Sequence, residues 1–595
     1  MEAGDAVELE KRQRAVIKSL RDNMSGVWSS DAWWWRWLLL LSLLALATRM
    51  SSLDQPSGTA WDEVHFGGFG NMYINRTYFH DVHPPLGKML VAGALYLTGY
   101  QGTFSFHINT LYPQDFHLAT VRAMFGVLGS ALVPLSFLTV WELTGSIPAA
   151  VIAAVAMLTD HYMHRLCTLI LLDGPLILGI LASVYCSIRF HNTKEKVWSR
   201  WWWVQLSATG VCLGTIMSIK YIAVFTVVFV GLHTAYQLVI ILTEPNKSMW
   251  LVVPHTAARA LCLILLPLGL YLATFVLHFA VLNKWMPDSG GFYHTRFTSS
   301  FDNTEYDNKF FPKYLDYGAN ITLKNNLAMS GYLESWYDLF PSAFTAPCQQ
   351  ITLTTLKDSE SITWTLRFVN VTAGQVEDTN GVRPEGRRVV HNGDHIVLTH
   401  QATGRSMRTH GHRAPITRRH FQVCGYGDDG EAGPFETWQI LVPGMAEGTP
   451  IETLGTDFLL MNFKMNCYLA NPGNTDLPNW AFQSAKEVTC TRNREAHGLL
   501  WHVNWVNATR LPLTRTAREY SMSLWEKIVH QHEAMMLGNS GLRPKKEDLQ
   551  NSARPWMWPL LYRLQVLCVY TVDAISRHLN ATVTPTDSLT NSTIP

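Results

Sequence analysis

Charged residues are scarce in this sequence, and the motifs of several common enzyme classes are missing from it. Asp, Glu, Lys and Arg make up only 16% of the 595 residues, against 48% hydrophobic residues, which is unusual for a soluble enzyme. The net charge of +1, with no dense basic face outside the N-terminal arm, does not indicate a nucleic-acid partner. No P-loop, GxGxxG, GxSxG or HExxH pattern occurs in a supporting context, which disfavours a nucleotide-driven pump and a luminal protease.

The nine cysteines are too few and too scattered for a disulfide scaffold. Five lie in apolar runs and are expected to pack as small hydrophobic residues: Cys167, Cys186, Cys212, Cys262 and Cys568. The other four lie in polar sequence and can pair if that region is luminal, although the sequence does not decide the pairs: Cys348, Cys424, Cys467 and Cys490. No CxxC pair or Cys/His cluster has zinc spacing, so no structural metal is expected.

Long apolar runs, by contrast, crowd the first half of the chain. They predict a transmembrane domain over residues 31–283 with about seven spans, near residues 33–50, 118–142, 146–159, 166–188, 202–219, 221–243 and 257–282. The polar arm 1–30 lacks a signal-peptide core and is expected to stay in the cytosol. Basic residues fall in the even-numbered gaps, as the positive-inside rule requires: Arg189, Lys194, Lys196, Arg200, Lys247 and Arg259. The loop 51–115 and the region after residue 283 are therefore expected to be luminal.

Acceptor sequons for N-glycosylation agree with this topology. Four lie on the predicted luminal side and begin at Asn75, Asn320, Asn370 and Asn507. Two others, at Asn23 and Asn246, lie on the predicted cytosolic side and are expected to go unused.

The region 315–505 contains three similar units, each with a strand-like run followed by a tryptophan-containing strand. These strands begin at Trp364, Trp438 and Trp501. Single units of this size cannot each bury an apolar face, so we expect them to close around a shared threefold core as a β-trefoil. The composition of residues 506–595 predicts a linker and a partly disordered tail. The apolar run 564–572 within it is short for a membrane span.

Two adjacent carboxylates, Asp62 and Glu63, follow the first span. Neighbouring acids repel each other and are costly to bury, so they need a compensating task. A carboxylate placed next to an acceptor hydroxyl can take its proton during glycosyl transfer, a contribution of roughly 10² to 10⁴ in rate. The alternative is that both acids cap a helix starting near Val64, and spacing alone leaves both readings open.

Several cations lie near or within the predicted spans. Pro84 and Pro85 are expected to open an amphipathic interfacial helix over 86–97, with the apolar stripe Leu86, Met89, Leu90, Ala94 and Leu97. His83 and Lys88 then lie at headgroup depth, where they can touch a phosphate or where Lys88 merely snorkels. Arg122 and Lys220 are costly inside the membrane. They indicate either an anionic ligand such as a leaving phosphate or an internal ion pair with Asp173.

Together these residues resemble the protein O-mannosyltransferase family of the endoplasmic reticulum. The resemblance covers about residues 33–560 and is carried by Asp62-Glu63, His83-Pro84-Pro85-Leu86-Gly87-Lys88, Arg122, Ile170-Leu171-Leu172-Asp173, Lys220-Tyr221 and the three repeats, which are similar to a MIR domain. Asn75-Arg76-Thr77 and the intact His83-Pro84-Pro85 run are more similar to the second animal type than to the first.

The resemblance implies a multipass α-helical membrane protein of the GT-C type with a luminal β-trefoil (MIR) domain. It implies transfer of mannose from dolichyl phosphate mannose to Ser or Thr of secretory-pathway proteins, with inversion and without a metal or cofactor. Asp62 would be the general base and Glu63 would help to place the acceptor. Arg122 and Lys220 would hold the donor phosphate, with three weaker candidates: Arg49, His83 and Lys88. A heteromer of two related subunits in the endoplasmic reticulum membrane is also implied.

The alternative function is a catalytically silent subunit that binds nascent chains through the MIR domain. Two departures from the family bear on it. Family members continue into further spans after the MIR domain, whereas this chain ends soon after Pro559, so a truncated, alternatively spliced or wrongly joined product is expected. The family pattern Leu-His-Ser-His reads Leu333-Glu334-Ser335-Trp336 and Met407-Arg408-Thr409-His410 here, which weakens the expectation of glycan or peptide binding by the first two repeats.

Overall fold

The computed structural model describes residues 33–542, with gaps at 194–195, 245–247, 287–292, 342–347, 358, 373, 379–387, 428–431, 474 and 482–484. The chain forms two compact units. Among the described residues, unit 1 contains 33–76 and 83–282, and unit 2 contains 77–82 and 283–542. The predicted cytosolic arm and the tail beyond residue 542 lie outside the described residues.

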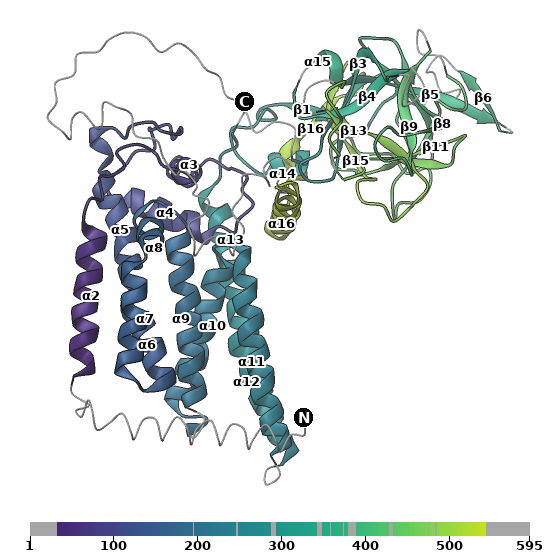
Figure 1. The fold of residues 1–595 in the computed structure, drawn as a ribbon. Coiled ribbons are helices and arrows are strands. Elements are labelled where there is room, and N and C mark those ends of the chain that lie inside the picture. The colour runs from purple at the N-terminus through teal and green to yellow at the C-terminus, as the bar shows by residue number, and fades with distance from the viewer. Residues whose placement is uncertain are drawn as a thin grey trace, which may run out of the picture. The chain divides into compact units, whose positions relative to one another are not determined.

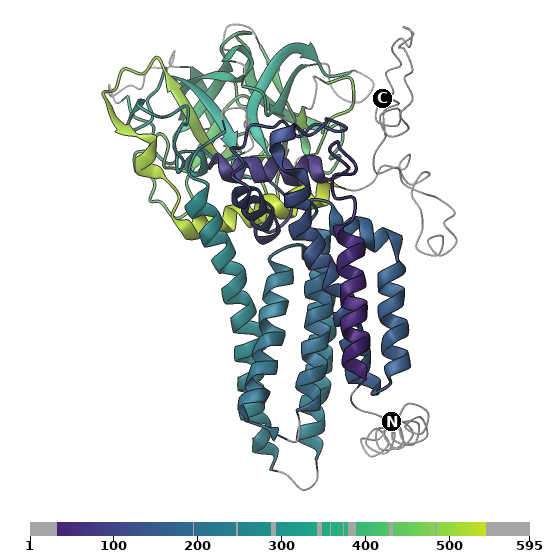
Figure 2. The same cartoon turned by 90° about the vertical axis from the view of Figure 1, so that its left-hand side faces the viewer.

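Unit 1 is a bundle of apolar helices that lie side by side (Figures 1 and 2). Its long elements are α2 (Trp34–Met50), α5 (Leu118–Ser130), α6 (Leu132–Thr144), α7 (Ile147–Thr159), α9 (Asp173–Asn192), α10 (Arg200–Met217) and α11 (Val224–Thr243). They are followed by α12 (Val252–Ala260) and α13 (Leu266–Val281), which are joined by the π-helical turn Leu261–Leu265. Leucine, valine and alanine dominate these sequences, so the helices present apolar surface on most sides, as spans in lipid require.

Helices occur at all seven positions where spans were predicted. Four helical stretches are both long and apolar enough to cross a membrane: Gln114–Thr144, Asp173–Asn192, Tyr221–Thr243 and Met249–Val281. The remaining three, α2, α7 and α10, have 17, 13 and 18 residues, and the total of seven spans stays a prediction. The predicted start of the fourth span at residue 166 is wrong, because the helix begins at Asp173, where an acid and Pro175 favour a first turn.

Three shorter helices gather at one end of the bundle: α3 (Glu63–Ile74), α4 (Leu86–Leu97) and α8 (His161–Thr168) (Figures 1 and 2). The bounds of α4 confirm the predicted helix over residues 86–97, while its position at a membrane interface stays a prediction. In the predicted apolar stripe of α4, Leu90 and Leu97 are exposed as expected. Ala94 is instead buried, together with Val91 and Leu95. Gly87 is needed there, because a Cβ would lie 2.9 Å from Leu172 and 3.1 Å from Ile219. This contact holds the start of α4 against the segment before Lys220.

A buried apolar cluster joins these short helices to α5, α9 and α10. Its members include Phe66, Val91, Leu95, Phe106, Phe116, Phe125, Ile170, Leu171, Leu172, Leu213, Ile216 and Ile219. The cluster therefore fixes the ends of several helices next to the acidic pair at the start of α3.

Unit 2 is built around three repeats of four strands. The first contains β2 (Asn320–Asn325), β3 (Gly331–Leu339), β4 (Gln349–Thr354) and β5 (Thr363–Thr372). The second contains β7 (His395–His400), β8 (Ser406–Arg413), β9 (Phe421–Tyr426) and β10 (Trp438–Leu441). The third contains β11 (Leu459–Asn462), β12 (Cys467–Ala470), β14 (Thr489–Thr491) and β15 (Trp501–Asn507).

The repeats close on one another with threefold symmetry. The fourth strand of each repeat pairs with the first strand of its own repeat and of the next: β5 with β2 and β7, β10 with β7 and β11, and β15 with β2, while Trp501 bridges to Phe458 beside β11. The three tryptophans are equivalent, because the indole nitrogens of Trp364, Trp438 and Trp501 donate to the carbonyls of Leu333, Met407 and Leu469 at 3.0, 2.9 and 3.0 Å. The predicted β-trefoil is thereby confirmed.

Disulfides and short elements complete unit 2. The pairs that the sequence left open are Cys348–Cys424 and Cys467–Cys490. Outside the repeats, β1 (Phe310–Pro312) pairs with β16 (Leu513–Thr516), and the helices are α14 (Thr295–Thr298), α15 (Ser359–Ile362) and α16 (Leu524–Gly541). Two further strands are β6 (Gln375–Asp378), which pairs with β5, and β13 (Lys486–Glu487), which pairs with β4. Ser523 and Glu526 form a capping box that begins α16.

Candidate active site

The acidic pair lies at the start of α3, where the backbone makes a sharp turn. Trp61 has a φ of +46°, a conformation that is uncommon for a residue other than glycine, and Asp62 is the N-cap of the helix. The preceding residues are tied to the loop before α5, since Thr59 N donates to Thr110 O at 2.9 Å and Tyr112 N donates to Ser57 O at 3.0 Å. The turn is thus held from both sides.

The Glu63 carboxylate is completely buried and accepts five hydrogen bonds. Oε1 accepts from Arg122 Nε at 3.0 Å and from Ile170 N at 2.9 Å. Oε2 accepts from Arg122 Nη2 at 2.8 Å, from Ala60 N at 3.0 Å and from the Tyr112 hydroxyl at 3.2 Å. Burial, followed by the charge of Glu63, raises the pKa of Tyr112 well above its ordinary value, so Tyr112 remains a donor. Glu63 is saturated by these contacts.

Arg122 is the buried cation that pairs with Glu63. Its third nitrogen, Nη1, donates to the carbonyls of Leu53 at 3.1 Å and Pro56 at 2.8 Å, so all three guanidinium nitrogens have partners. The side chain is completely buried, as is that of Glu63. The sequence left two interpretations of Arg122 open, an anionic ligand or an ion pair with Asp173. Arg122 does form an internal ion pair, but its partner is Glu63 and not Asp173. The bidentate pair therefore joins α5 to α3 at the base of the acidic turn.

Asp62 has a different environment from its neighbour. It is half-buried and occupies the N-cap position, with Glu63 in the first turn, as the capping alternative expects. Its carboxylate nevertheless makes no capping hydrogen bond to α3. The pKa of Tyr162, in α8, is raised first by burial and then by the charges of Asp173 and Asp62. Both carboxylates therefore lie within electrostatic reach of this phenol, which is 52% exposed.

Lys220 lies on the same side of α3. Its Nζ donates to Asp173 Oδ1 at 2.9 Å and Oδ2 at 3.1 Å, which confirms the predicted ion pair for this lysine. Nζ also lies 5.7 Å from the ring centroid of Phe66, one helical turn after Asp62. The Lys220 and Asp173 side chains are 15% and 23% exposed, so the pair is accessible from solvent, unlike the Glu63–Arg122 pair.

The run from His83 to Lys88 borders this area. Leu86 N donates to Ser218 O at 3.0 Å, which places the start of α4 beside the segment that leads to Lys220. Lys88 is only 2% exposed; its Nζ donates to the His83 carbonyl and lies 5.7 Å from the Phe69 ring centroid. The alternative that Lys88 snorkels to the surface is therefore wrong, because its ammonium is buried in the protein.

Arg49, in the last turn of α2, is a buried cation for which no ion pair occurs among the described residues. Its Nη2 donates to Met157 O at 3.1 Å, whereas Nε and Nη1 have no hydrogen-bond partner among the residues that the structure describes. The Arg49 charge is also one of the causes that lower the pKa of His164 in α8, after burial. Arg49 thus supplies a positive charge close to the end of the bundle that carries α8.

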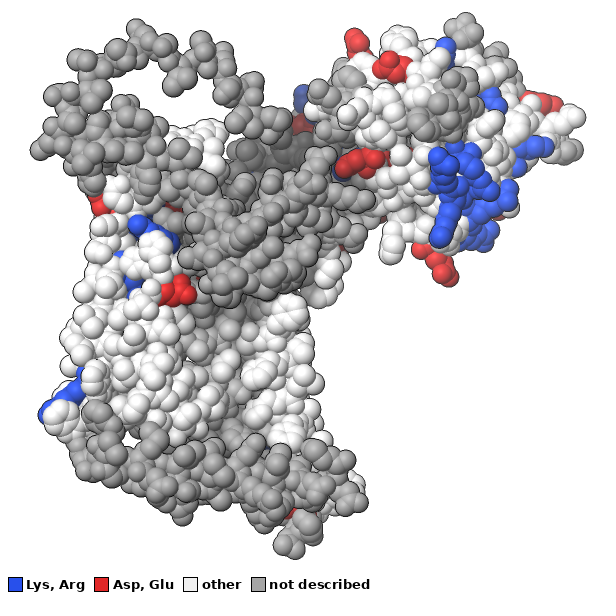
Figure 3. Space-filling view, viewed as in Figure 1, with Lys and Arg blue, Asp and Glu red and all other residues white. Residues whose placement is uncertain are grey.

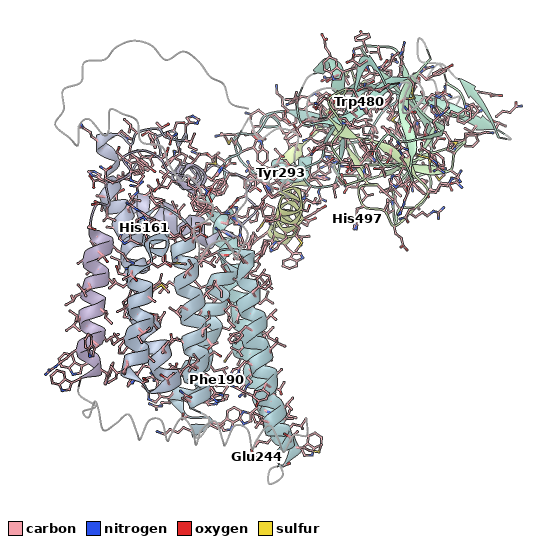
Figure 4. The ribbon with its side chains drawn as sticks, viewed as in Figure 1. His161, Phe190, Glu244, Tyr293, Trp480 and His497 are labelled. Atoms are coloured by element: carbon pink, nitrogen blue, oxygen red, sulfur yellow. A yellow bond between two sulfur atoms is a disulfide. The ribbon has the colours of Figure 1, made fainter. Side chains whose placement is uncertain are left out.

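These groups share one end of the bundle. His161, the neighbour of Tyr162, is at that end, whereas Phe190 and Glu244 are at the opposite end (Figure 4). Tyr112, Tyr162 and the Ile170 amide were not predicted as site residues. Ile170 belongs to a run that the family resemblance had singled out, but a single tyrosine, such as Tyr112 in a loop or Tyr162 in α8, gives no sequence signal.

Two groups of potential metal ligands occur among the described residues, both in unit 2. One contains Cys348 and Cys424, which form a disulfide. In the other, His294 Nε2 donates to Asp457 Oδ1 at 3.1 Å, while His294 Nδ1 accepts from Arg296 N at 3.0 Å. His502 Nε2 likewise accepts from Thr295 N at 3.3 Å. The imidazole nitrogens of this second group already serve a protein hydrogen-bond network.

The four predicted glycosylation sites differ in accessibility. Asn75, at the end of α3, and Asn507, at the end of β15, are exposed. Asn320 and Asn370 are half-buried within strands β2 and β5. Glycosylation of all four stays a prediction, and the two exposed residues are the better acceptors.

Comparisons with known proteins give one consistent answer. A family model described as dolichyl-phosphate-mannose-protein mannosyltransferase matches residues 39–283. The chain is 37% identical over 530 residues to Protein O-mannosyl-transferase 2 of Danio rerio and 35% identical over 561 residues to that of Drosophila melanogaster. These matches cover 88% and 93% of this chain and 68% and 71% of the relatives. A solved structure of the Saccharomyces cerevisiae protein O-mannosyltransferase Pmt1-Pmt2 complex bound to the sugar donor is similar, with a TM-score of 0.74 and 27% identity over 92% of this chain and 72% of that chain.

Proposed function

Because this chain belongs to the protein O-mannosyltransferase family and performs protein O-mannosylation, we propose that Asp62 is the general base of its mannosyl transfer. The observation that carries this proposal is the contrast between two adjacent carboxylates. The Glu63 carboxylate is buried and accepts five hydrogen bonds, whereas Asp62 is half-buried and makes no side-chain capping hydrogen bond to its helix. Of the two, Asp62 is the one that a substrate hydroxyl can reach.

In the proposed reaction, the hydroxyl oxygen of an acceptor Ser or Thr attacks C1 of the mannose carried by dolichyl phosphate. The bond between C1 and the phosphate oxygen breaks, and dolichyl phosphate leaves with the bonding electron pair. The hydroxyl proton passes to the Asp62 carboxylate, and the configuration at C1 inverts. Removal of this proton by a positioned base contributes roughly 10² to 10⁴ in rate.

The Glu63–Arg122 pair is assigned a positioning role. Its hydrogen bonds connect α3, α5, the loop at Leu53 and Pro56, and the backbone of Ile170. This network fixes the turn at Trp61 and hence the position of the Asp62 carboxylate. Rigid placement of a catalytic group matters because small displacements reduce its effectiveness strongly.

Lys220 is the cation that best fits the donor phosphate. Negative charge on the phosphate grows as the bond to C1 breaks, and a nearby ammonium stabilises it. Lys220 is partly accessible and lies next to Phe66, on the same side as Asp62. Arg49, His83 and Lys88 remain further candidates. Arg49 is supported by its two unpartnered nitrogens, whereas the Lys88 ammonium already donates to the His83 carbonyl.

The proposed setting is the endoplasmic reticulum membrane, with the N-terminus cytosolic, unit 2 luminal and a related mannosyltransferase as partner subunit. The solved complex that resembles this chain contains two such chains. Exposed Lys196 lies between α9 and α10, and exposed Arg200 is the first residue of α10, at the end of the bundle opposite to α8. Positive residues of this kind favour the cytosolic side, so the site at the other end faces the lumen.

The test is mannosyl transfer to an acceptor peptide by membranes that contain this chain and its partner subunit. Asp62→Asn is expected to lower the rate by at least about 100-fold, since the amide cannot accept the proton. Asp54→Asn, in the same loop but exposed, is the matched control and is expected to retain full activity. Full activity of Asp62→Asn, combined with loss of activity when the corresponding acids of the partner are changed, would instead identify this chain as the silent subunit.

A further inference from the structure

Five arginines lie close together on the surface of unit 2. They are Arg413 at the end of β8, Arg418 and Arg419 in the loop to β9, and Arg492 and Arg494 just after β14. All five are exposed. Figure 3 shows Lys and Arg side chains gathered in one broad area of this unit, on the side of β8 and β11 in Figure 1. We call these five residues the arginine surface.

Phe421, the first residue of β9, packs against two residues of the arginine surface, Arg413 and Arg492. The guanidinium carbon of Arg413 lies 5.0 Å from the Phe421 ring centroid and that of Arg492 lies 5.2 Å from it. Arg413 Nη1 also donates to Arg419 O at 3.2 Å, and Arg492 Nε donates to Met465 O at 3.3 Å, beside the exposed Lys464. Because the ring and two carbonyls orient the guanidinium groups of Arg413 and Arg492, this part of the surface is preformed.

Among the described residues, few carboxylates lie near the arginine surface. None of the five arginines forms an ion pair with a residue in the part of the chain that the structure describes. The nearby Glu487 is buried and accepts instead from the amides of Ile416 and Thr417, at 2.8 and 3.0 Å. Glu495 is the one exposed acid within the segment 413–421 or 489–495. A net positive field therefore remains at the surface.

From this geometry we propose that the arginine surface docks acidic segments of the acceptor polypeptide. The proposal rests on the transfer to polypeptides described above and adds a preference for acceptors with Asp and Glu near the modified Ser or Thr. Guanidinium groups match the planar geometry of carboxylates and bind them in a bidentate manner. Arginines that have no ion-pair partner among the described residues are suited to this role, and they accelerate encounter with a charged chain.

A polypeptide fits this surface better than a lipid membrane. Surfaces that bind lipid headgroups usually combine cations with apolar side chains that enter the acyl region. Within the segments 413–421 and 489–495, Ile416, which is 42% exposed, is the one large hydrophobic residue that is exposed. Charge without an apolar anchor favours an extended acidic partner in solution.

The experiment compares two acceptor peptides that differ only in flanking residues, Asp and Glu in one and Asn and Gln in the other. The complex of this chain with its partner subunit is studied in lipid nanodiscs. For the unaltered enzyme, we expect the acidic peptide to have a KM about three- to tenfold lower than the neutral peptide, with equal kcat. Added salt should remove this difference, because the contacts are exposed.

The double variant Arg492→Gln/Arg494→Gln should raise the KM for the acidic peptide alone. The matched control is Lys309→Gln/Arg510→Gln, which removes two exposed cations elsewhere on unit 2 and should leave both peptides unaffected. Equal KM values for the two peptides with the unaltered enzyme would overturn the proposal. It would also be overturned if KM responded to phosphatidylserine in the nanodisc and not to peptide charge, which would assign the surface to lipid headgroups. Transfer to the neutral peptide reports separately on the mannosyltransferase activity.

Discussion

At the scale of single residues, Asp62 and Glu63 show how two neighbouring carboxylates acquire separate roles. The turn at Trp61 directs Glu63 into the bundle, where Arg122, Tyr112 and two backbone amides surround it. A buried carboxylate is stable only when its charge is paired and its lone pairs are used. In the proposed mechanism, the contacts that bury Glu63 also hold the turn that carries Asp62.

Removing one partner of the buried pair should destabilise the protein more than it alters chemistry. For Glu63→Gln or Arg122→Met, we expect a loss of about 3–5 kcal/mol, because an uncompensated charge or polar group stays in the core. Thermal denaturation of the purified protein measures this loss. Asp62→Asn is the control and should denature at nearly the unaltered temperature. A Glu63→Gln variant as stable as the unaltered protein would contradict the assigned positioning role.

Lys220 is expected to contribute to the binding of the donor phosphate. Lys220→Ala is expected to weaken donor binding about tenfold, since a charge-assisted contact to the phosphate is lost. Lys220→Arg should retain part of the affinity because it keeps the positive charge. Equilibrium binding of dolichyl phosphate mannose to the purified complex provides the measurement. Lys196→Ala, at the opposite end of the bundle, serves as the control. If Lys220→Ala bound the donor as tightly as the unaltered protein, the phosphate would have to be bound by another cation.

A buried histidine in unit 2 should make stability depend on pH. Burial, followed by the charges of His294 and His80, lowers the pKa of His530 from 6.5 to about 3. The folded state therefore leaves His530 neutral between these values, whereas the unfolded chain binds a proton. Stability is complete above pH 6.5 and decreases as the pH falls, by about 2 kcal/mol from this group at pH 5.

The variant that tests this dependence is His530→Phe, because the His530 ring packs 4.9 Å from that of Phe297 and an aromatic ring can replace it. Thermal unfolding followed by tryptophan fluorescence at pH 7 and pH 5 should show a smaller difference for the variant than for the unaltered protein. An identical pH dependence of both proteins would show that other groups, such as His502, account for it.

At the scale of elements, the three repeats of the β-trefoil share one stabilising contact. Each repeat buries a tryptophan whose indole donates to a carbonyl of its second strand. Replacing Trp364, Trp438 or Trp501 by Phe removes this hydrogen bond and leaves a cavity, so each change should cost roughly 1–3 kcal/mol. Chemical denaturation measures the three losses side by side. If one variant were fully stable, the repeats would not be energetically equivalent.

Elements with a strong local pattern were predictable from the sequence. The repeated tryptophan strands predicted the trefoil, and the Pro84-Pro85 pair with its apolar periodicity predicted the bounds of α4. Among contacts between distant segments, the ion pair of Lys220 with Asp173 was predicted, but most others were not. The partner of Arg122 lies 59 residues away, and four cysteines permit three pairings, of which the fold selects one. Local pattern determines which elements form, whereas tertiary packing determines which side chains meet.

At the scale of the whole molecule, a helical unit with a polar site at one end is combined in one chain with a β-trefoil unit. The uneven hydrophobic composition predicted this division. The sequence also singled out Asp62 and Glu63, but it did not separate the proposed catalytic carboxylate from the proposed positioning one, because both acids have the same local context. That distinction required the contacts of Glu63 and Arg122.

The most direct measurement is a single-turnover rate of mannosyl transfer by the intact complex, with donor bound at saturation, for the unaltered chain and for Asp62→Asn. The account predicts that donor affinity stays the same while the transfer rate falls at least about 100-fold. A transfer rate that is unchanged in Asp62→Asn, with donor bound equally well, would contradict the assignment of Asp62 as the base.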